Sequence, residues 1–237
     1  MHRPRLFLIL FIAAQTVLAA GAMAATITGT AKYEGSVPKL PTVRMDADPN
    51  CAKKHSGPVV SEVLVLGDGN TMGNILVHVK SGLSGKSYTA PKEPVVMDQK
   101  GCRYIPHVMG VMVGQPFKIL NSDGILHNVH ALPKVNKQFN MAMPASRTEA
   151  IETFNKEEGV FKIKCDVHPW MTSYIGVMTH PFFDVTAKNG KFTISDLPAG
   201  TYEIDAWHER LDSQTQTVTV GADETKTINF TFSRPSR

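Results

Sequence analysis

Short runs of apolar or alternating residues recur along most of this chain, and each run ends near Gly, Pro, Asn or Asp. This rhythm favours strands joined by turns over helices. The clearest example is residues 160–165, where Phe161, Ile163 and Cys165 alternate with two lysines, as expected for a strand with one buried face. The runs expected to form strands include Glu62–Leu66, Ile75–Val79, Val95–Asp98, Pro116–Leu120 and Val160–Cys165. The sequence therefore predicts an all-β fold, either a sandwich or a barrel.

The C-terminal part of the chain follows the same pattern and adds turn signals. Asn189 and Gly190 can adopt the positive φ angles of a tight hairpin turn, and Pro198 and Gly200 mark a second turn. Residues 217–232, TVTVGADETKTINFTF, are expected to form two strands joined by a Gly-Ala-Asp turn. The all-β prediction thus extends to the C-terminus.

The N-terminus carries an export signal. Two arginines precede an apolar run, residues 6–20, and Ala22-Met23-Ala24 offers a cleavage site of the small-x-small type. An uncleaved membrane anchor is the alternative, but the apolar run is short for a bilayer span. We expect a signal peptide over residues 1–24, a mature chain that begins near Ala25 and has no membrane span, and a periplasmic location.

The charge of the mature chain argues against a nucleic-acid partner. The 237-residue chain has a formal net charge of +4, and residues 1–24 hold two arginines and no acidic residue, so +4 minus 2 leaves +2. The remaining lysines and arginines are scattered along the sequence. Nucleic-acid binding requires a clustered basic surface, and none is expected here.

The strongest chemical signal is the segment Cys165-Asp166-Val167-His168-Pro169-Trp170-Met171, which places a thiol, an imidazole and a thioether within one loop. A further histidine, His127, follows a turn at residues 121–124. Soft sulfur favours Cu(I), and imidazole suits both copper states. Two His and one Cys with a weak axial Met is therefore the ligand set of an electron-transfer copper. The pattern predicts one copper ion that cycles between Cu(I) and Cu(II).

Each of these residues also has an ordinary structural explanation. His127 alone could be a hydrogen-bonded core histidine, and Cys165 alone could be a buried thiol. A single methionine such as Met171 more often fills a core than binds a metal. The metal site is preferred because all of these residues fit one ligand set together.

The chain has three cysteines, Cys51, Cys102 and Cys165. Export implies an oxidising compartment, where thiols tend to pair, and three thiols cannot all pair within one chain. Because Cys165 lies in the metal-like motif, we predict a disulfide between Cys51 and Cys102.

Two segments in order, LHNVHAL at residues 126–132 and CDVHPWM at residues 165–171, resemble the cupredoxins, the family of blue copper proteins that includes amicyanin and plastocyanin. The Cys-x2-His-x2-Met spacing is similar to that of amicyanin. Residues 94–120 also resemble the opening strands of that protein. The likeness spans roughly residues 94–178 and implies a Greek-key sandwich with a type 1 copper site.

The resemblance assigns roles residue by residue. It implies copper ligands at His127, Cys165, His168 and Met171, and it makes Asn128 an outer residue that tethers the cysteine loop. It also implies that electrons leave through an apolar patch formed by His168, Pro169 and Trp170. One departure from the family is an insertion around residues 134–148.

The flanking segments resemble a second family. NGKFTISDLPAGTYEIDAWHE, residues 189–209, and ATITGTAKYEGSVPK, residues 25–39, resemble the carboxypeptidase regulatory-like, or transthyretin-like, β-sandwich. We therefore expect an N-terminal β segment over residues 25–90, a cupredoxin domain over 91–179 and a C-terminal segment over 180–237. The two flanks would form one sandwich with the cupredoxin inserted between them. Two extra β segments packed onto the cupredoxin are the simpler alternative.

The remaining histidines are expected to lie away from the metal. His130 points to the strand face opposite His127, and His107 is expected on a strand. His55, His180 and His208 are expected at the surface.

These observations favour a one-electron carrier that exchanges electrons with a periplasmic redox protein, such as a dehydrogenase or a cytochrome c. They do not favour an enzyme, because no acid–base pair accompanies a nucleophile and no second, open metal site is evident. The alternative is a copper-binding or copper-delivery protein with no electron-carrier role. A structural sandwich with a degenerate site is a third reading, and the complete ligand set argues against it.

Overall fold

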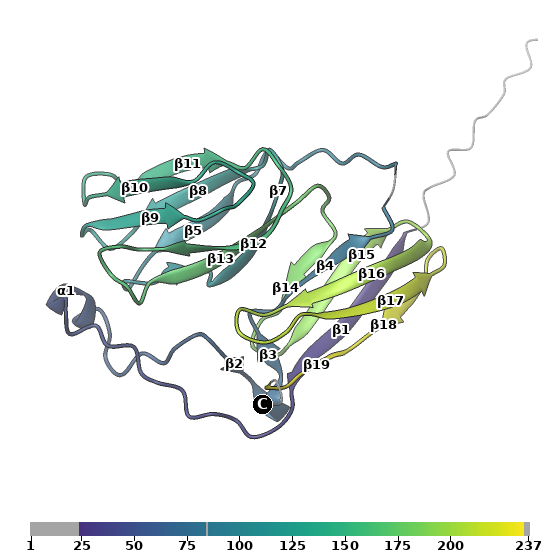
Figure 1. Cartoon of the computed structure of the whole chain (residues 1–237), viewed down its shortest axis with the longest axis horizontal. Coiled ribbons are helices and arrows are strands. Elements are labelled where there is room, and N and C mark those ends of the chain that lie inside the picture. The colour runs from purple at the N-terminus through teal and green to yellow at the C-terminus, as the bar shows by residue number, and fades with distance from the viewer. Residues whose placement is uncertain (1–23, 84, 235–237) are drawn as a thin grey trace, which may run out of the picture.

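The computed structural model describes residues 24–83 and 85–234, and it shows an all-β chain. The predicted signal peptide, residues 1–24, lies outside the described part except for Ala24. Within the described ranges, no helix is long and apolar enough to span a bilayer. The helical elements there are α1 (Pro49–Ala52) and the 3-10 turn η1 (Asp68–Asn70). Figure 1 shows two separate layered β bodies, which confirms the predicted fold class.

The first body is the sandwich that was expected to be the cupredoxin. Two sheets pack on each other, with strand orders β10-β9-β12-β13-β7 and β11-β8-β5-β6. Pairs β7–β13 and β5–β8 are parallel, and the other pairs are antiparallel. The strands of the first sheet are β7 (Val108–Met112), β9 (His127–Ala131), β10 (Phe139–Met143), β12 (Glu158–Lys164) and β13 (Thr172–Met178). Those of the second are β5 (Val95–Gln99), β6 (Tyr104–Ile105), β8 (Pro116–Asn121) and β11 (Glu149–Thr153).

The second body is built from both ends of the chain. One sheet has the order β15-β1-β18, with β19 also paired to β1, and the other has the order β14-β4-β16-β17. The strands are β1 (Ala25–Tyr33), β15 (Lys191–Leu197), β18 (Thr225–Thr227), β19 (Phe230–Phe232), β4 (Leu76–Ser81), β14 (Phe183–Val185), β16 (Gly200–Trp207) and β17 (Gln214–Val220). The short strands β2 (Val65–Leu66) and β3 (Met72–Gly73) pair with each other. The first sandwich is thus inserted between β4 and β14. The predicted boundaries, 90/91 and 179/180, fall in the connections on either side of it.

Each sandwich has its own buried apolar core, and a small third cluster joins them. That cluster contains Leu76, Val108 and Met178, with Phe183 and Trp207 packed against it. Gly110 and Gly176 face each other on β7 and β13 at this junction. A Cβ on Gly110 would lie 2.5 Å from the Phe183 ring, so the missing side chain lets the two bodies approach closely.

Two predicted turns connect layers of the second sandwich. Gly190 has the expected positive φ of 70°. However, β14 pairs with β4 while β15 pairs with β1, so this turn carries the chain from one sheet to the other and closes no hairpin. The turn at residues 221–224 likewise leads from β17 in one sheet to β18 in the other. The hairpin predicted at Asn189-Gly190 is therefore wrong, although the turn itself is present.

Residues 34–62, which we call the arm, differ from the prediction that the whole N-terminal segment belongs to the second sandwich. Figure 1 shows the arm leaving β1 and carrying α1 to the far end of the first sandwich. Its outward and return limbs pair through Val43 N–H and the Val59 carbonyl, 2.7 Å apart, and Met45 is buried in the first core. A disulfide between Cys51 and Cys102, as predicted, fixes the arm to the first sandwich.

Candidate metal centre

Three metal-binding side chains meet at one end of the first sandwich. His127 is the first residue of β9, Cys165 directly follows β12, and His168 lies in the loop before β13. The Nδ1 atoms of the two histidines are 2.9 Å apart, and Cys165 Sγ lies 3.9 Å from His168 Nδ1. The three side chains offer donor atoms that all lie within 4.8 Å of one another. All three residues are at most 2% exposed, so the donors form an enclosed site.

The loop that holds Cys165 is tight because its backbone closes on itself. Cys165 N–H donates to the Met171 carbonyl at 3.2 Å, and Met171 N–H donates to the His168 carbonyl at 2.9 Å. His168 N–H points to Cys165 Sγ at 3.3 Å. The Met171 side chain is 1% exposed and packs in the same core cluster as Cys165. All four predicted ligand residues therefore lie at the same end of the sandwich.

Asn128 spans the gap between the two ligand segments. Its Oδ1 accepts hydrogen bonds from Asp166 N–H at 2.7 Å and Val167 N–H at 3.3 Å. The same oxygen lies 3.2 Å from Cys165 Sγ. This is the position expected of an outer residue that tethers the cysteine loop.

The insertion around residues 134–148 adds a further brace. It forms β10, which pairs with β9 and places Met143 opposite His127. Asn140 Nδ2 donates to Asp166 Oδ2 at 2.8 Å, and His130 Nδ1 contacts the same oxygen at 2.9 Å. The pKa of Asp166 lies well below its usual range, because its carboxylate accepts hydrogen bonds from Lys164, Asn140 and His130. His130 thus supports the ligand loop from outside.

The ring nitrogen of His127 that faces away from the other donors, its far nitrogen, is hydrogen-bonded to a carboxylate. His127 Nε2 lies 2.9 Å from Asp123 Oδ2, and Asp123 also accepts the backbone N–H groups of Gly101 and Cys102, at 2.8 and 2.7 Å. Burial raises the pKa of Asp123, but these hydrogen bonds outweigh it and lower the pKa to about 2. The carboxylate is therefore ionised and orients the imidazole with Nδ1 toward Cys165.

The far nitrogen of His168 is also hydrogen-bonded to a carboxylate, and this carboxylate belongs to a residue of the arm. His168 Nε2 lies 3.0 Å from Asp48 Oδ2. The resemblance placed the edge of this imidazole in a surface patch with Pro169 and Trp170, whereas the ring is 2% exposed beneath the arm. Pro169 is exposed, and Trp170 is half-buried with its indole N–H donating to the Cys102 carbonyl at 3.1 Å. The structure differs from the expectation here because the Cys51–Cys102 disulfide holds the arm over this face.

The surroundings also favour a thiolate. Burial raises the pKa of Cys165, but hydrogen bonds from His127 and from the backbone outweigh it, so the pKa lies below its ordinary value. Burial lowers the pKa of His127, but Asp123 and Cys165 outweigh it and raise that pKa. A thiolate is the form of cysteine that binds a metal.

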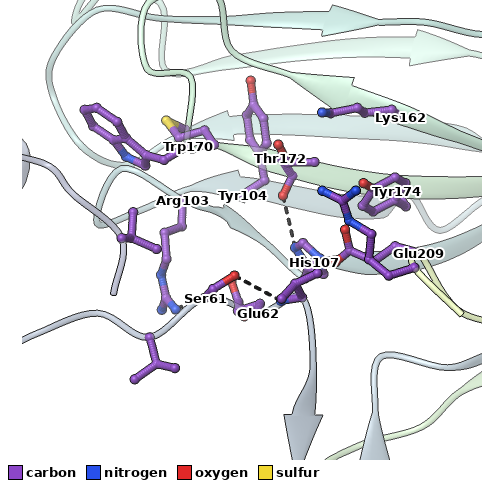
Figure 2. A pocket seen from close by; sticks show the side chains of 15 residues that line it. Ser61, Glu62, Arg103, Tyr104, His107, Lys162, Trp170, Thr172, Tyr174 and Glu209 are labelled. Carbon is purple, nitrogen blue, oxygen red and sulfur yellow. Dashed lines mark hydrogen bonds and ion pairs between the residues drawn. The ribbon is translucent and has the colours of Figure 1, made fainter. Parts of the chain in front are cut away.

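A cavity of about 160 Å³ lies where the arm and the two sandwiches meet, next to the ligand loop. Figure 2 shows His107 on its wall between Thr172 and Glu209. His107 Nδ1 lies 3.1 Å from the Thr172 carbonyl, and its Nε2 lies 2.7 Å from Glu209 Oε1. Because Thr172 directly follows Met171, this contact connects the second sandwich to the ligand loop.

Two histidines expected at the surface are instead buried. His180 is 6% exposed, and its Nε2 lies 2.9 Å from the Val79 carbonyl. His208 is 5% exposed, and its Nδ1 accepts backbone N–H groups of Arg210 and Leu211. Both side chains satisfy local backbone groups, which explains how they can be buried.

Sequence reasoning missed the two carboxylates behind the histidines. Asp123 had a weak signal, since it lies in the turn at residues 121–124, four positions before His127. Asp48 had none, because it is 120 positions from His168 and reaches it only through the fold of the arm.

Comparisons with known proteins found one matching family model and several similar solved structures. Residues 181–233 match the family model of the carboxypeptidase regulatory-like domain. A mutant of amicyanin in the Cu(I) state is similar at 21% identity, over 41% of this chain and 96% of that chain, with a TM-score of 0.32. A purple cupredoxin from Nitrosopumilus maritimus is similar at 26% identity, over 32% of this chain and 81% of that chain, with a TM-score of 0.27.

A copper-containing nitrite reductase from Thermus scotoductus is similar at 23% identity, over 39% of this chain and 24% of that chain, with a TM-score of 0.31. No curated protein matches the chain.

Proposed function

We propose that this chain is a periplasmic copper protein that transfers single electrons through one type 1 copper ion. The observation that carries the proposal is the convergence of His127 Nδ1, His168 Nδ1 and Cys165 Sγ within 4.8 Å in an enclosed site. Two imidazoles and one thiolate are the donors that such a copper takes, and Met171 is the proposed weak axial ligand.

The residues around the site fit this group. Copper bound there would supply the one-electron Cu(I)/Cu(II) couple. The protein's part is to keep the donors fixed, which Asn128, Asp123 and Asp48 do by bonding the cysteine loop and both far nitrogens. Fixed donors limit rearrangement when the charge of the metal changes, which favours rapid electron transfer.

The enclosed donors favour a carrier over an enzyme. A catalytic metal keeps a coordination position open to substrate, whereas His127, Cys165 and His168 are at most 2% exposed. The proposed partner is a periplasmic redox protein such as a dehydrogenase or a cytochrome c. Leu126 and Val167, each next to a proposed ligand in sequence, are 49% and 46% exposed and offer such a partner an apolar surface.

The visible absorption spectrum of the purified protein tests the proposal, measured before and after addition of Cu(II) beside a Cys165→Ser control. We expect an intense blue band that disappears on reduction and is absent from the control. A protein that stays colourless despite confirmed copper loading and an added oxidant would contradict an electron-transfer role.

A copper-binding or copper-delivery role without electron transfer is the second candidate. The observation that favours it is the arm over His168, which covers the edge through which electrons were expected to leave. The electron self-exchange rate of the copper-loaded protein separates the two functions. Slow exchange together with ready loss of Cu(I) to a chelator would favour delivery, and fast exchange with retained copper would favour the carrier.

A further inference from the structure

The Cys51–Cys102 disulfide lies directly behind the two candidate histidine ligands. Cys51 Sγ, an oxygen of Asp48 and a ring nitrogen of His168 lie within 4.8 Å of one another. Cys102 Sγ, an oxygen of Asp123 and a ring nitrogen of His127 form a second group within the same limit. Because the disulfide joins the two sulfurs, the two groups form one continuous set of donors on the far side of the imidazoles.

These sulfurs, carboxylates and imidazoles are the kinds of donor that bind metals, but the two sulfurs cannot act as thiolate ligands while they form the disulfide. A disulfide sulfur is a poor ligand, whereas two thiolates form a soft pair that suits Cu(I). Both cysteines are fully buried, and the Asp123 side chain is 3% exposed. Asp48 and Asp123 already hold the imidazoles from this side, so the donors would be in place once the sulfur–sulfur bond is broken.

We propose that the reduced Cys51–Cys102 pair is a second copper site, which takes one Cu(I) between its two thiolates beside the first site. The proposal rests on the proposed function only for the identity of the metal. When the cysteines are oxidised, the disulfide closes the arm over His168. When they are reduced, a Cu(I) ion takes the place of the sulfur–sulfur bond as the link between arm and sandwich.

The reaction balances with a dithiol or a phosphine as reductant. A dithiol becomes a disulfide and transfers two electrons and two protons to Cys51 and Cys102, which break their bond and become two thiols. A phosphine takes oxygen from one water molecule and becomes a phosphine oxide, and the two hydrogens of that water go to the thiols. Binding of Cu(I) then releases the thiol protons to solvent, and copper does not change its oxidation state.

Contacts other than the disulfide keep the two sulfurs near each other. Lys54 Nζ lies 3.2 Å from Asp123 Oδ1 and 2.8 Å from the Asp123 carbonyl. His55 Nε2 lies 2.8 Å from the Gly101 carbonyl, next to Cys102 in sequence. Met45 packs in the first core. The positive charge of Lys54 also offsets part of the negative charge that two thiolates would add.

The test counts the Cu(I) retained per chain under anaerobic conditions in the presence of a competing Cu(I) chelator. Two samples of the exported protein are compared. One is left oxidised, and the other is unfolded in urea, reduced with a phosphine and refolded. A thiol assay confirms one thiol per chain before reduction and three after it. Circular dichroism confirms that each sample is folded. A Cys165→Ser variant and a Cys51→Ser/Cys102→Ser double variant are the controls.

We expect retained copper to double, from one ion per chain in the oxidised protein to two in the reduced protein. Reduced Cys165→Ser should retain one ion, and the double variant should retain one ion and still give the blue band after oxidation. A single ion in the fully reduced wild-type protein, or no ion in reduced Cys165→Ser, would overturn the second site. Absence of the blue band, with copper still retained by reduced Cys165→Ser, would contradict the proposed function alone.

Discussion

At the scale of single residues, each candidate histidine ligand is held by a carboxylate on its far nitrogen. His127 is paired with Asp123 at 2.9 Å, and His168 is paired with Asp48 at 3.0 Å. Such a partner fixes the tautomer and the ring orientation and increases the basicity of the coordinating nitrogen. Asp123 is part of the same sandwich as the histidines, whereas Asp48 is contributed by the arm, so part of the site depends on a segment outside the sandwich.

The role of Asp48 can be tested with an Asp48→Ala variant. Loss of the carboxylate frees His168 Nε2, and we expect copper affinity to fall about 10–100-fold, as is typical for outer-shell partners. Competition with a chelator of known affinity measures this change. Asp46→Ala is the matched control, because Asp46 is an exposed residue of the same part of the arm. Equal affinities in the two variants would show that Asp48 does not hold the ligand.

The role of Asn128 can be tested in the metal-free protein. Asn128→Ala leaves the backbone N–H groups of Asp166 and Val167 without their acceptor, and we expect a loss of about 2 kcal/mol in the free energy of unfolding. Urea unfolding measures the loss. Asn155→Ala, at an exposed asparagine of the same sandwich, should change stability by less than about 0.5 kcal/mol. A similar loss in both variants would contradict the bracing role.

At the scale of elements, the arm is the feature that changes the site most. It is held at its tip by the disulfide, by the Lys54–Asp123 ion pair and by the Asp48–His168 contact. The disulfide closes a long loop, with a sequence separation of 51 residues, so its removal releases considerable chain entropy.

A Cys51→Ser/Cys102→Ser variant should therefore let the arm open more often, while the contacts of Lys54, His55 and Met45 still hold its average position. The loop-closure relation gives a loss of up to about 4 kcal/mol in stability for a loop of this length. We also expect trypsin to cleave after Lys53 and Lys54 at least about tenfold faster, because local opening of the arm makes the backbone beside these exposed residues accessible to the protease. Mass spectrometry of the digest locates the cleavage. Unchanged cleavage rates would mean that non-covalent contacts alone hold the arm closed.

The strands, turns and loops show which features of the fold could be predicted from the sequence and which could not. The alternation in residues 160–165 predicted a strand correctly, because burial of one face is a local property. The turn at Asn189-Gly190 was also local, but the sheet that each flanking strand joins depends on β4 and β1, which lie far away in sequence. The compact Cys165–Met171 loop could be recognised from its spacing. Asp48 could not be, because only the folded arm brings it to His168.

At the scale of the whole molecule, two small contacts combine the sandwiches into one unit. One is the apolar junction at Gly110 and Gly176, and the other is the buried His107–Glu209 pair. The second contact includes Thr172, which begins β13 directly after Met171. Packing between the sandwiches is therefore connected to the position of the ligand loop.

The apolar junction can be tested with Gly110→Ala. The new methyl group would lie 2.5 Å from the Phe183 ring, and we expect a loss of about 1–3 kcal/mol from overpacking. Gly159→Ala is the control, because a Cβ there meets nothing within 4 Å. A Gly110→Ala/Phe183→Leu double variant should recover part of the loss. Additive losses in the double variant, measured by urea unfolding, would contradict direct contact.

The His107–Glu209 contact should make the stability of the junction between the sandwiches fall at acidic pH. Burial raises the pKa of Glu209, but hydrogen bonds from His107 and Tyr174 outweigh it and hold the pKa below its ordinary value of 4.5. A group whose pKa is lower in the folded state stabilises the protein above its ordinary pKa, and this contribution is lost as pH falls through the folded-state pKa.

Glu209→Gln removes that charge while it keeps the shape of the side chain. We expect the variant to be about 1–3 kcal/mol less stable than the wild type at pH 7, because the lost hydrogen bond involves a charged group. The difference should stay constant down to pH about 4.5 and then shrink, since protonation removes the same charge from the wild type. Urea unfolding at a series of pH values measures the difference. Glu203→Gln is the control, because Glu203 is an exposed residue of β16, the strand that ends two residues before Glu209. A difference that persists at low pH would assign the effect to the amide group of Gln and not to the loss of the Glu209 charge.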